Sequence, residues 1–481
     1  MEVLNLIQGK HVSAKGGEWL DIINPSEGKV YGRIPRSGAE DVSMAVESAE
    51  KAFKCWAATP ISVRSKCLTR LADLVAQNAD LLAKAESTDN GKPVSLANSV
   101  DIPRAESNLR FYSSAITHFA SESHSMEGVA INYTLRKPLG VVACISPWNL
   151  PLYLFTWKIA PALAAGNCVV AKPSEITPVT AYLLSTWVKE AGFPDGVFNI
   201  IHGLGTEVGD ALVRHPKVAA VSFTGGTATG AHIASVAAPK FKKLSLELGG
   251  KNAAVVFNDC DFEEALATTI RSSFANQGQI CLCGSRILVE RSLYPKFRDA
   301  LVEKTRNMQV GDPQDPSTKM GALVSKDHRD KILSYIDIAR QEGGKILCGG
   351  TATTPKNAPH LSNGYYVQPT IIEGLDFDSR VNMEEIFGPV VTIQPFESDE
   401  EAVEIANSTE FGLAATVWTK DLKRAHNVAA ALETGIVWVN CWLLRDLRTP
   451  FGGVKNSGVG REGGFEALQF FTEPQNVCIK L

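Results

Sequence analysis

The sequence lacks the features of a membrane, secreted or nucleic-acid-binding protein. Its longest apolar stretch, residues 159–171, is interrupted by Pro161, Gly166 and Asn167 and is too short to span a bilayer. Polar side chains interrupt the first ten residues too early for a signal peptide. The formal net charge is only −4 over 481 residues, and no run of like charge forms a basic stripe. We therefore expect a cytoplasmic protein with no membrane and no nucleic-acid partner.

Disulfide and metal frameworks are also missing. The ten cysteines are scattered, without the paired spacing of a disulfide scaffold or of CxxC metal knuckles. They are expected to be reduced thiols, most of them packed like small hydrophobic residues, and no metal site is predicted. They lie at Cys55, Cys67, Cys144, Cys168, Cys260, Cys281, Cys283, Cys348, Cys441 and Cys478.

What the chain does contain is an alternation of strand-like and helix-like runs between residues 138 and 250. Strands that are apolar throughout, joined by crossover helices, indicate a parallel sheet covered on both faces, which is the architecture of nucleotide-binding domains. The length also exceeds what one hydrophobic core usually serves, so two or more domains are expected. The predicted strands are 141–145, 168–171, 197–201 and 219–223, and the predicted helices are 152–165, 181–191 and 207–214.

A second alternation begins after Gly250. Strands are predicted at 253–257 and 287–290, with a helix at 262–274 between them, which indicates a second α/β domain. Residues 119–138 and 470–481 fit neither series, although they contain short alternating runs. Taken alone, these two segments would be an edge hairpin and a frayed terminus.

Cys281 is the most informative residue, because it follows a small, turn-forming segment that could present a thiol. Glu247 lies earlier in the chain, and Asn149 ends residues 146–149. A thiol, a carboxylate and a carboxamide can supply a nucleophile, a general base and an oxyanion donor. Each also has an ordinary explanation: a packed cysteine, a solvated charge on an alternating strand, and a cap for the helix after Leu150.

Four motifs, in this order along the chain, resemble the aldehyde dehydrogenase superfamily. They are SPWN at 146–149, ELGGK at 247–251, GQIC at 278–281 and EEIFGP at 384–389, and Lys158, 450–453 and 457–462 continue the match. The resemblance implies an α/β aldehyde dehydrogenase fold with a Rossmann-like NAD-binding domain and a second α/β catalytic domain. It also implies a small β arm that joins subunits into a homodimer or homotetramer. The implied ranges are 1–119 and 139–247 for the NAD-binding domain, 248–465 for the catalytic domain, and 120–138 and 466–481 for the arm.

The same resemblance implies a mechanism. The Cys281 thiolate attacks the aldehyde, and the Asn149 side chain and the Cys281 backbone N–H bind the oxygen of the thiohemiacetal. Hydride transfer to NAD leaves a thioester, which water activated by Glu247 hydrolyses. A free cysteine titrates near ~8.5 and an apolar site alone raises that value, so helix dipoles or nearby donors are expected to stabilise the thiolate.

Two glycine-rich segments are candidates for the dinucleotide site. Residues 203–209 are one residue too long for GxGxxG and are interpreted as a tight turn and a helix start. Residues 223–230 resemble the family's phosphate-binding turn, with Gly226 where serine is usual. Residues matching Lys172 and Glu175 hold the adenosine ribose in the family, and a carboxylate there favours NAD over NADP; a solvated strand end is the alternative. The expected cofactor-binding residues are Ile145, Pro147, Trp148, Lys172, Glu175, Gly205, Gly225, Gly230, Glu385 and Phe387.

Substrate choice depends on residues 101–104 and 440–448. They resemble the branch of the family that oxidises 2-aminomuconic and 2-hydroxymuconic semialdehydes, whose substrates carry a carboxylate opposite the aldehyde. The resemblance assigns Arg104 and Arg445 to that carboxylate, and Trp157 to the same pocket. Guanidinium suits this role because it is always charged and bidentate. The alternative is that both are surface arginines paired with Asp101 or Asp446.

The predicted function is NAD-dependent oxidation of 2-aminomuconate 6-semialdehyde, and the 2-hydroxymuconate analogue is a close second that no residue separates. A betaine-type or general aldehyde dehydrogenase is less favoured, because a pocket for a cationic substrate should not contain arginines. A non-enzymatic, crystallin-like role is disfavoured because Cys281, Glu247 and Asn149 are all present.

Overall fold

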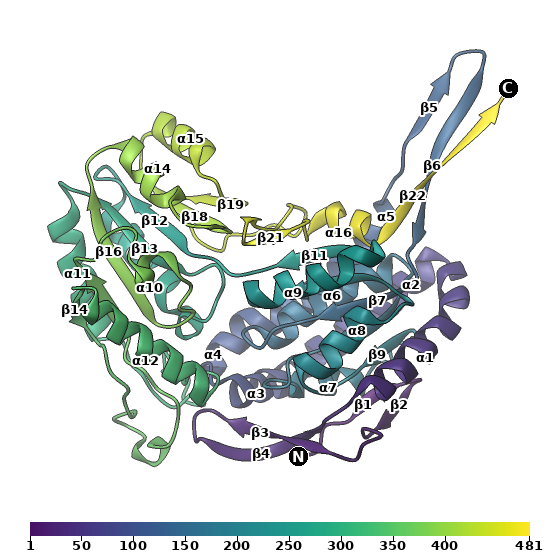
Figure 1. The fold of residues 1–481 in the computed structure, drawn as a ribbon, viewed down its shortest axis with the longest axis horizontal. Coiled ribbons are helices and arrows are strands. Elements are labelled where there is room, and N and C mark those ends of the chain that lie inside the picture. Colours follow the sequence, from purple (N-terminus) through teal and green to yellow (C-terminus); the bar gives the residue numbers. More distant parts are fainter.

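The computed structural model describes residues 1–481 as two α/β lobes with a projecting arm (Figure 1). The first lobe contains an eight-stranded sheet whose five strands from β9 to β11 are parallel, which confirms the predicted parallel sheet. In spatial order its strands are β2 (Lys10–Val12), β1 (Asn5–Ile7), β9 (Phe198–Ile200), β8 (Cys168–Lys172), β7 (Val141–Ile145), β10 (Val218–Thr224), β11 (Lys243–Glu247) and β21 (Gly458–Val459).

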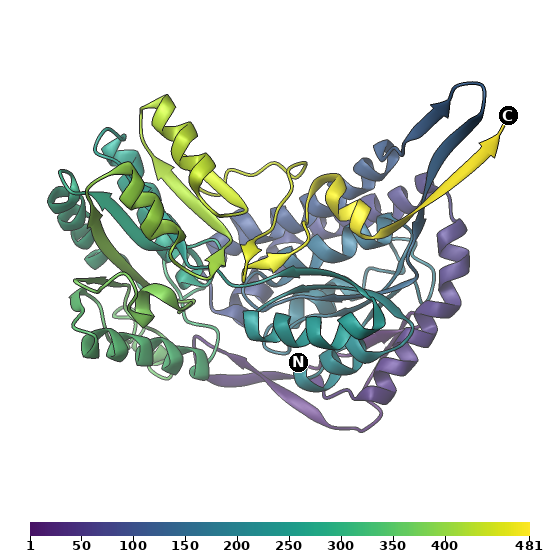
Figure 2. The same cartoon turned by 45° about the horizontal axis from the view of Figure 1, so that its top comes forward.

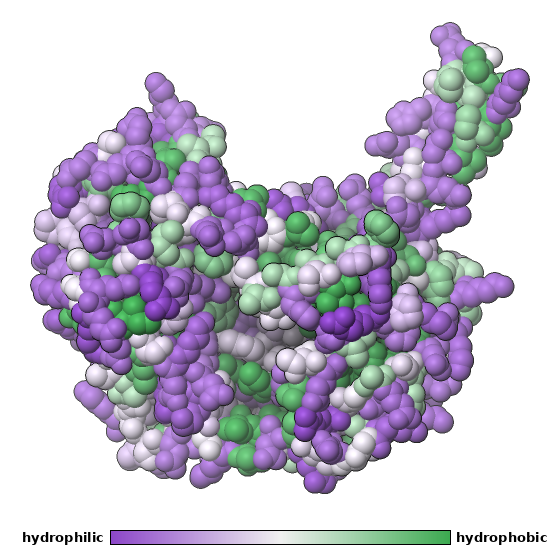
Figure 3. All heavy atoms as spheres, in the orientation of Figure 1, coloured by the Kyte–Doolittle hydropathy of each residue, from purple (hydrophilic) through white to green (hydrophobic).

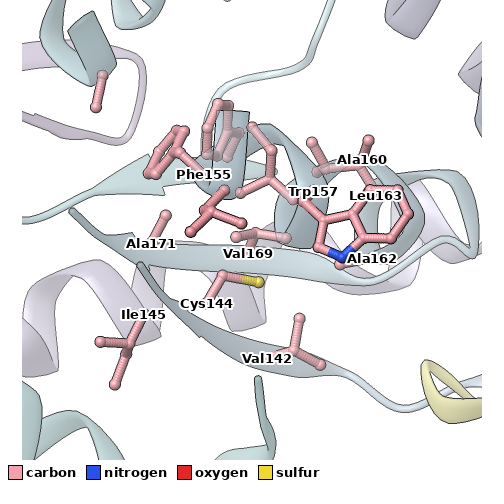
Figure 4. Packing of buried hydrophobic residues seen from close by; sticks show 14 of the residues in the cluster. Val142, Cys144, Ile145, Phe155, Trp157, Ala160, Ala162, Leu163, Val169 and Ala171 are labelled. Atoms are coloured by element: carbon pink, nitrogen blue, oxygen red, sulfur yellow. The ribbon is translucent and has the colours of Figure 1, made fainter. Parts of the chain in front are cut away.

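Helix α6 (Pro151–Ala164) is the core helix of this lobe. Every one of its residues is buried, as are all residues of β7 and β8. A helix that is apolar on all sides is expected in the interior of a large domain. Figure 4 shows Phe155 and Trp157 of α6 over one face of these strands. The short connection from β7 to α6, residues 146–150, is therefore anchored at both ends by buried structure.

Helix α7 (Val179–Ser185) is shorter than the predicted helix 181–191. The hydroxyl groups of Ser185 and Thr186 donate to the carbonyl oxygens of Tyr182 and Leu183, three residues earlier. Such local bonds compete with the α-helical pattern. The backbone after Ser185 continues with bonds that also span three residues, so the chain runs on as turns to residue 192.

The second lobe contains a seven-stranded sheet, parallel except for its edge strand β14. Helix α10 (Phe262–Phe274) has the predicted bounds, and Asp261 caps its first turn by accepting from the Glu264 N–H. The second α/β alternation is therefore confirmed. In spatial order the strands are β14 (Lys345–Cys348), β15 (Thr370–Glu373), β16 (Val390–Phe396), β13 (Gly284–Glu290), β12 (Asn252–Val256), β18 (Ala414–Trp418) and β19 (Ile436–Val439).

The arm is a three-stranded antiparallel sheet of β5 (Ser123–Met126), β6 (Ala130–Pro138) and β22 (Thr472–Lys480). It projects away from both lobes (Figures 1 and 2). The C-terminus is not frayed, because β22 pairs with β6 along its whole length. Helix α16 (Gly464–Phe470) precedes β22 and packs on the body of the first lobe.

The arm also exposes apolar side chains, which form a hydrophobic patch at its end (Figure 3). Each of them is between 41% and 52% exposed. An edge sheet with such a surface is usually covered by another chain. The residues concerned are Met126, Val129, Ile131, Leu135 and Ile479.

Strand β21 shows that the two halves of the chain are interleaved. It comes from the last part of the sequence, yet it pairs antiparallel with β11 at the edge of the first sheet. Phe451, Leu468 and Phe471 likewise pack into the hydrophobic core of the first lobe. Apart from β21, the strands of the first sheet end at residue 247 and those of the second sheet follow it, while the domain limits at 247 and 465 stay a prediction. None of the helices combines the length and the apolar character needed to cross a membrane.

Candidate active site

A cavity of about 200 Å³ lies beyond the carboxyl ends of β7 and β10, where they meet the second lobe. It brings together two of the three predicted catalytic residues and five of the predicted cofactor residues. This is the position in which α/β sheets bind ligands. Its lining residues are Pro147, Trp148, Asn149, Thr224, Gly225, Gly226, Leu248, Gly249, Cys281, His328, Lys331, Glu385 and Phe387.

The loop before Cys281 has an unusual backbone. Asn276, Gln277 and Gly278 are consecutive residues with φ of +51°, +58° and +69°. Non-glycine residues in this left-handed region are uncommon and costly unless surrounding structure enforces them. At Gly278 a Cβ atom would lie 2.1 Å from the carbonyl oxygen of Gly388, so only glycine fits there.

Side-chain amides hold this loop in place. Gln277 Nε2 donates to the carbonyl oxygen of Ala322 at 2.8 Å, and Gln279 Oε1 accepts from the N–H of Val324 at 3.1 Å. Both amide side chains are almost wholly buried. The sequence analysis did not identify these glutamines as functional, although three amide residues within four positions of a turn are a detectable signal.

Asn149 joins the first lobe to the cysteine loop. Its Nδ2 donates to the carbonyl oxygen of Gln279 at 3.0 Å. It does not cap α6, whose N-cap is Leu150, so the capping explanation is wrong. The second hydrogen of its carboxamide and the backbone N–H of Cys281 have no acceptor within the chain. Two free donors are therefore available beside the thiol.

The environment of Cys281 opposes ionisation of its thiol. Burial raises the pKa of Cys281, the carboxyl groups of Glu247 and Glu385 raise it further, and Arg445 opposes them. The expected stabilisation of the thiolate is therefore not supplied by the chain alone. At neutral pH the resting group is the neutral thiol, and a nearby base must accept its proton.

Glu247 is the last residue of β11 and is only 4% exposed, so it is not a solvated charge. Its Oε1 has no hydrogen-bond partner. Burial, and then the neighbouring carboxyl of Glu462, raise the pKa of Glu247 well above the usual range, while Lys158 and Arg445 act in the opposite direction. A buried carboxyl with a raised pKa suits a general base that works near neutral pH.

Lys158 and Glu462 form a buried ion pair beside Glu247. Lys158 Nζ donates to Glu462 Oε1 at 2.8 Å and to Ser222 Oγ at 3.2 Å. The pair links α6 to the C-terminal segment that crosses back to the first lobe. The Glu462 carboxyl raises the pKa of Glu247 and the Lys158 ammonium lowers it, so the two members of the pair have opposite effects.

An aromatic cluster forms one wall of the cavity. The ring of Trp148 lies 5.0 Å from that of His328 and 5.3 Å from that of Phe387. His328 Nε2 donates to the carbonyl oxygen of Phe387 at 2.7 Å, and burial lowers the pKa of His328 to about 4, so the imidazole is neutral. Phe387 itself has a φ of +62°. His328 was missed by the sequence analysis, because no motif surrounds it.

Glu385 reaches the same cavity from the segment after α13 (Arg380–Met383). Its Oε1 accepts from the N–H of Gly250 at 2.9 Å, which fixes the carboxylate against the chain that follows Glu247. Burial raises the pKa of Glu385. A Cβ at Gly249 would lie 2.4 Å from Glu385 Oε2, so a side chain there would displace this carboxylate.

Lys172, Glu175 and Gly205 lie together at the ends of β8 and β9. Lys172 Nζ donates to Glu175 Oε2 at 2.9 Å, and Glu175 Oε1 accepts from the N–H of Gly205 at 3.4 Å. Burial works against ionisation of Glu175, but the nearby Lys172 ammonium favours it more strongly, and the pKa of Glu175 lies below the usual range. Lys172 is 2% exposed, so the solvated strand end is wrong for this residue.

The predicted glycines divide into two groups. Gly225 and Gly226 line the cavity, and Gly226 is the N-cap of α9 (Thr227–Ala237). Gly230 packs instead, since a Cβ there would lie 2.4 Å from Leu248. Ile145, the last residue of β7, is likewise buried outside the cavity lining.

Arg445 is held between two aromatic rings. Its Cζ lies 4.2 Å from the ring centre of Trp157 and 4.1 Å from that of Phe451, and Nη1 donates to the hydroxyl of Tyr153. Nε and Nη2 are buried and have no partner in the chain. The planar group is therefore fixed by stacking and by Tyr153, with one complete edge free.

Arg104 lies in the first turn of α5 (Ile102–His118) and makes no hydrogen bond or ion pair. It is one helical turn before Asn108, whose Nδ2 donates to the carbonyl oxygen of Tyr153 at 3.1 Å. The proposed surface pairing is wrong for both arginines, because Asp101 pairs with Lys92 and Asp446 pairs with Arg448.

No group of three or more histidine, cysteine or carboxylate side chains is arranged to hold a metal ion. The site brings together a thiol, carboxyls, a carboxamide and a stacked guanidinium. A thiol facing two free N–H donors and a buried base is suited to acyl transfer through a covalent intermediate.

Comparison with known proteins agrees with this chemistry. Residues 11–477 match the model of the aldehyde dehydrogenase family. The chain is 51% identical over 477 residues to 2-aminomuconic semialdehyde dehydrogenase of Bos taurus, covering 99% of this chain and 98% of that protein. It is 46% identical over 486 residues to 2-hydroxymuconic semialdehyde dehydrogenase of a Pseudomonas species, covering 100% of both.

A solved structure supports the same assignment. The NAD+ complex of an aldehyde dehydrogenase from Bacillus cereus superposes with a TM-score of 0.97 at 39% identity, covering 100% of this chain and 97% of that one. The family model, the relatives and the fold agree over nearly the whole length. The chain belongs to the aldehyde dehydrogenase family.

Proposed function

We propose that this protein oxidises 2-aminomuconate 6-semialdehyde to 2-aminomuconate with NAD. The observation that carries the proposal is the free edge of Arg445, whose Nε and Nη2 are buried without a partner. Nε and Nη2 of one guanidinium match the two oxygens of a carboxylate in a bidentate pair. The relative with 51% identity bears the name of this activity.

A buried donor without a partner costs roughly 1–3 kcal/mol, so two of them on one residue favour a ligand that accepts from both. Stacking on Trp157 and Phe451 fixes the plane of the guanidinium. It can therefore bind only a carboxylate that approaches along the free edge formed by Nε and Nη2. Arg104 adds a second positive charge without an anionic partner in the chain. A cationic substrate such as betaine aldehyde would meet unfavourable charge here.

The 2-hydroxymuconate analogue is the second candidate, since the relative with that name is 46% identical over its full length. Both substrates carry the carboxylate that Arg445 would bind. They differ in one amino or hydroxyl group, and none of the side chains around Arg445 named above would bind one of these groups in preference to the other.

The residues in and beside the cavity suit the two ends of a dinucleotide. Gly225, Gly226 and Gly249 leave its floor without side chains, and Trp148 and Phe387 provide flat apolar surfaces. The Lys172–Glu175 pair lies at strand ends suited to the adenosine ribose, and a carboxylate there disfavours a 2′-phosphate. When bound, the nicotinamide supplies the oxidising power by accepting a hydride.

The side chains of the protein perform the remaining steps. Cys281 Sγ bonds to the aldehyde carbon after losing its proton to Glu247, whose raised pKa allows it to hold that proton. The carbonyl oxygen accepts from Asn149 Nδ2 and from the N–H of Cys281, the two donors left free. After oxidation to the thioester, Glu247 releases the thiol proton to solvent and then takes a proton from water, and the hydroxide displaces the sulfur as a thiolate and forms the carboxylic acid.

The test follows NADH formation and semialdehyde loss together, for a carboxylated semialdehyde and for a neutral aldehyde of like size. Arg445→Ala should lower kcat/KM for the carboxylated substrate about 10²-fold, as expected when a buried charge loses its partner. It should lower kcat/KM for the neutral substrate far less, by the change in the pKa values of Cys281 and Glu247 alone, and Arg104→Ala should show the same selectivity with a smaller loss. Equal losses for both substrates would remove the carboxylate clamp from the proposal.

We further propose that the arm joins subunits into a homo-oligomer. Its apolar side chains are exposed, and β5 and β22 are the edge strands of its three-stranded sheet. The ten cysteines form no disulfides, which suits the reducing cytoplasm. Removing residues 472–481 should lower the particle mass measured by light scattering.

A further inference from the structure

A buried lysine lies behind the oxyanion site without lining the cavity. Lys92 Nζ donates to Asp101 Oδ2 at 2.6 Å and to the main-chain oxygen of Asn149 at 3.0 Å. Glu86 Oε1 lies 3.7 Å from the same nitrogen. The three charged side chains are completely inaccessible to solvent. Such a cluster cannot interact with a ligand directly, and its effect must pass through the residues that it holds.

The charge balance of the cluster is set by burial. Burial raises the pKa of Glu86 to about 8 and also raises that of Asp101, although Lys92 opposes both shifts. Lys92 and Asp101, in contact at 2.6 Å, form the ion pair, and Glu86 lies further from the ammonium, at 3.7 Å. A buried ion pair is often no more stabilising than apolar residues of similar volume. Its presence here is better explained by the geometry that it imposes.

Donors from both lobes converge on the backbone around Asn149. Asn90 Nδ2 donates to the carbonyl oxygen of Trp148 at 2.9 Å. Asn276 Nδ2, from the cysteine loop, donates at 2.9 Å to the Asn149 oxygen that Lys92 also binds. Lys92 and Asn276 thus share one acceptor, and that acceptor belongs to the residue whose carboxamide faces the thiol.

The same ammonium also holds the start of the helix that carries Arg104. Asp101 is the last residue of a π-helical turn, Ala97–Asp101, from which α5 continues, and Arg104 is the third residue of α5. Isolated π turns of this kind occur frequently at functional sites. The Lys92–Asp101 pair therefore connects the start of the arginine-bearing helix to Asn149.

We infer that Lys92 is a positioning residue that aligns the Asn149 carboxamide with the Cys281 N–H for binding the oxyanion. The inference rests on the proposed function, because it requires an aldehyde oxygen between these two donors. Lys92 fixes the backbone of Asn149 through its carbonyl oxygen, and Asp101 fixes Lys92. A displacement of about 1 Å in such a group can cost ~10²-fold in rate.

The test uses a neutral aldehyde, so that the arginines do not contribute. The double variant Lys92→Met, Asp101→Asn removes the ion pair without leaving a lone buried charge. Its kcat should fall by roughly 10- to 100-fold, while the affinity for NAD and the rate of Cys281 alkylation by iodoacetamide stay unchanged. Alkylation forms no oxyanion, so a general loss of structure would alter it, whereas misplacement of Asn149 would not.

Two comparisons decide the outcome. In an Asn149→Ala background the double variant should cause no further loss, whereas additive losses or an unchanged kcat would overturn the inference. Lys242→Met is the matched control, because Lys242 is a buried lysine that holds the carbonyl oxygens of Val213 and His215 instead; it should leave kcat unchanged. Turnover of neutral aldehydes alone would refute only the proposed substrate, and no NADH from any aldehyde would overturn both.

Discussion

The loop that carries Cys281 and the wall that carries Arg445 differ in whether their side-chain donors find hydrogen-bond partners within the chain. In the loop, the side-chain amides of Asn276, Gln277 and Gln279 all donate within the chain, and three consecutive residues stay in left-handed conformations as a result. In the wall, the guanidinium of Arg445 is stacked and buried, yet two of its three nitrogens lack partners.

This difference in hydrogen bonding corresponds to two tasks within the site, holding reactive groups in place and binding a ligand. Atoms that must stay in place for chemistry are bonded to the chain itself, and the donors aimed at a ligand are left without partners. The N–H donors of Asn149 and Cys281, which we propose bind the oxyanion, belong to the second kind, although the rest of their surroundings belongs to the first. Four substitutions, from the largest expected effect to the smallest, test this division.

Replacing the reactive sulfur should have the largest effect. Cys281→Ser should reduce NADH formation by about 10³-fold or more, because the serine hydroxyl is a far weaker nucleophile at neutral pH. Steady-state rates with either substrate measure it. Cys283→Ser, two residues further along the loop, is the matched control and should retain most of the activity; comparable losses in both would point to damage of the loop.

Removing the oxyanion donor should come next. Asn149→Ala should lower kcat by about 10²–10³-fold, the usual cost of losing one such donor. The loss should be the same for carboxylated and neutral aldehydes, because the carbonyl oxygen is common to both. A loss confined to one substrate class would mean that Asn149 contributes to substrate recognition rather than to binding the carbonyl oxygen.

Weakening the support of Arg445 should have a smaller and selective effect. Tyr153→Phe removes the hydroxyl that Nη1 binds, leaving a third donor without a partner. We expect about a tenfold rise in KM for the carboxylated substrate. Measured on a neutral aldehyde, the same variant should match the unsubstituted protein, and a rise there would show that Tyr153 shapes the whole pocket.

The smallest effect concerns stability and pH. Because the folded pKa of Glu247 is raised by burial, the folded state holds this proton more tightly than the unfolded chain does. Its contribution to stability is complete below the ordinary carboxyl pKa of about 4.3 and is lost as the pH rises through the folded value. Glu247→Gln should therefore become progressively more stable than the unsubstituted protein as the pH rises.

Urea unfolding at several pH values measures this difference. Glu466→Gln, at an exposed position of α16, is the control and should show no growing gap. A gap that stayed constant with pH would mean that Glu247 is ionised in the folded protein at all the values tested.

The alternation of apolar strands and helices predicted both sheets and the bounds of α10, because buried parallel strands and amphipathic helices have distinct local patterns. The motifs also predicted which residues meet at the cavity, although their roles in catalysis await the tests above. The end of α7 was not predicted, since it depends on the hydroxyl groups of Ser185 and Thr186, which donate to main-chain oxygens three residues earlier.

The features that escaped prediction involve residues far apart in the chain. Lys92 meets Asn149 because the segment at residues 90–92 is bonded to the backbone of the connection between β7 and α6, and no local pattern records this contact. The raised pKa of Cys281 depends likewise on burial by both lobes and on distant carboxyls. The free edge of Arg445 could not be predicted either, because the absence of a partner is visible only after the whole pocket is built.

The position of β21 has a consequence for biosynthesis. Residues 458–459 complete the edge of a sheet whose other strands all come from the first 247 residues. On a ribosome, that edge stays open until almost the entire polypeptide has emerged, and unpaired strand edges promote aggregation. We therefore expect nascent chains truncated before residue 458 to need chaperone protection, while the released full-length chain does not.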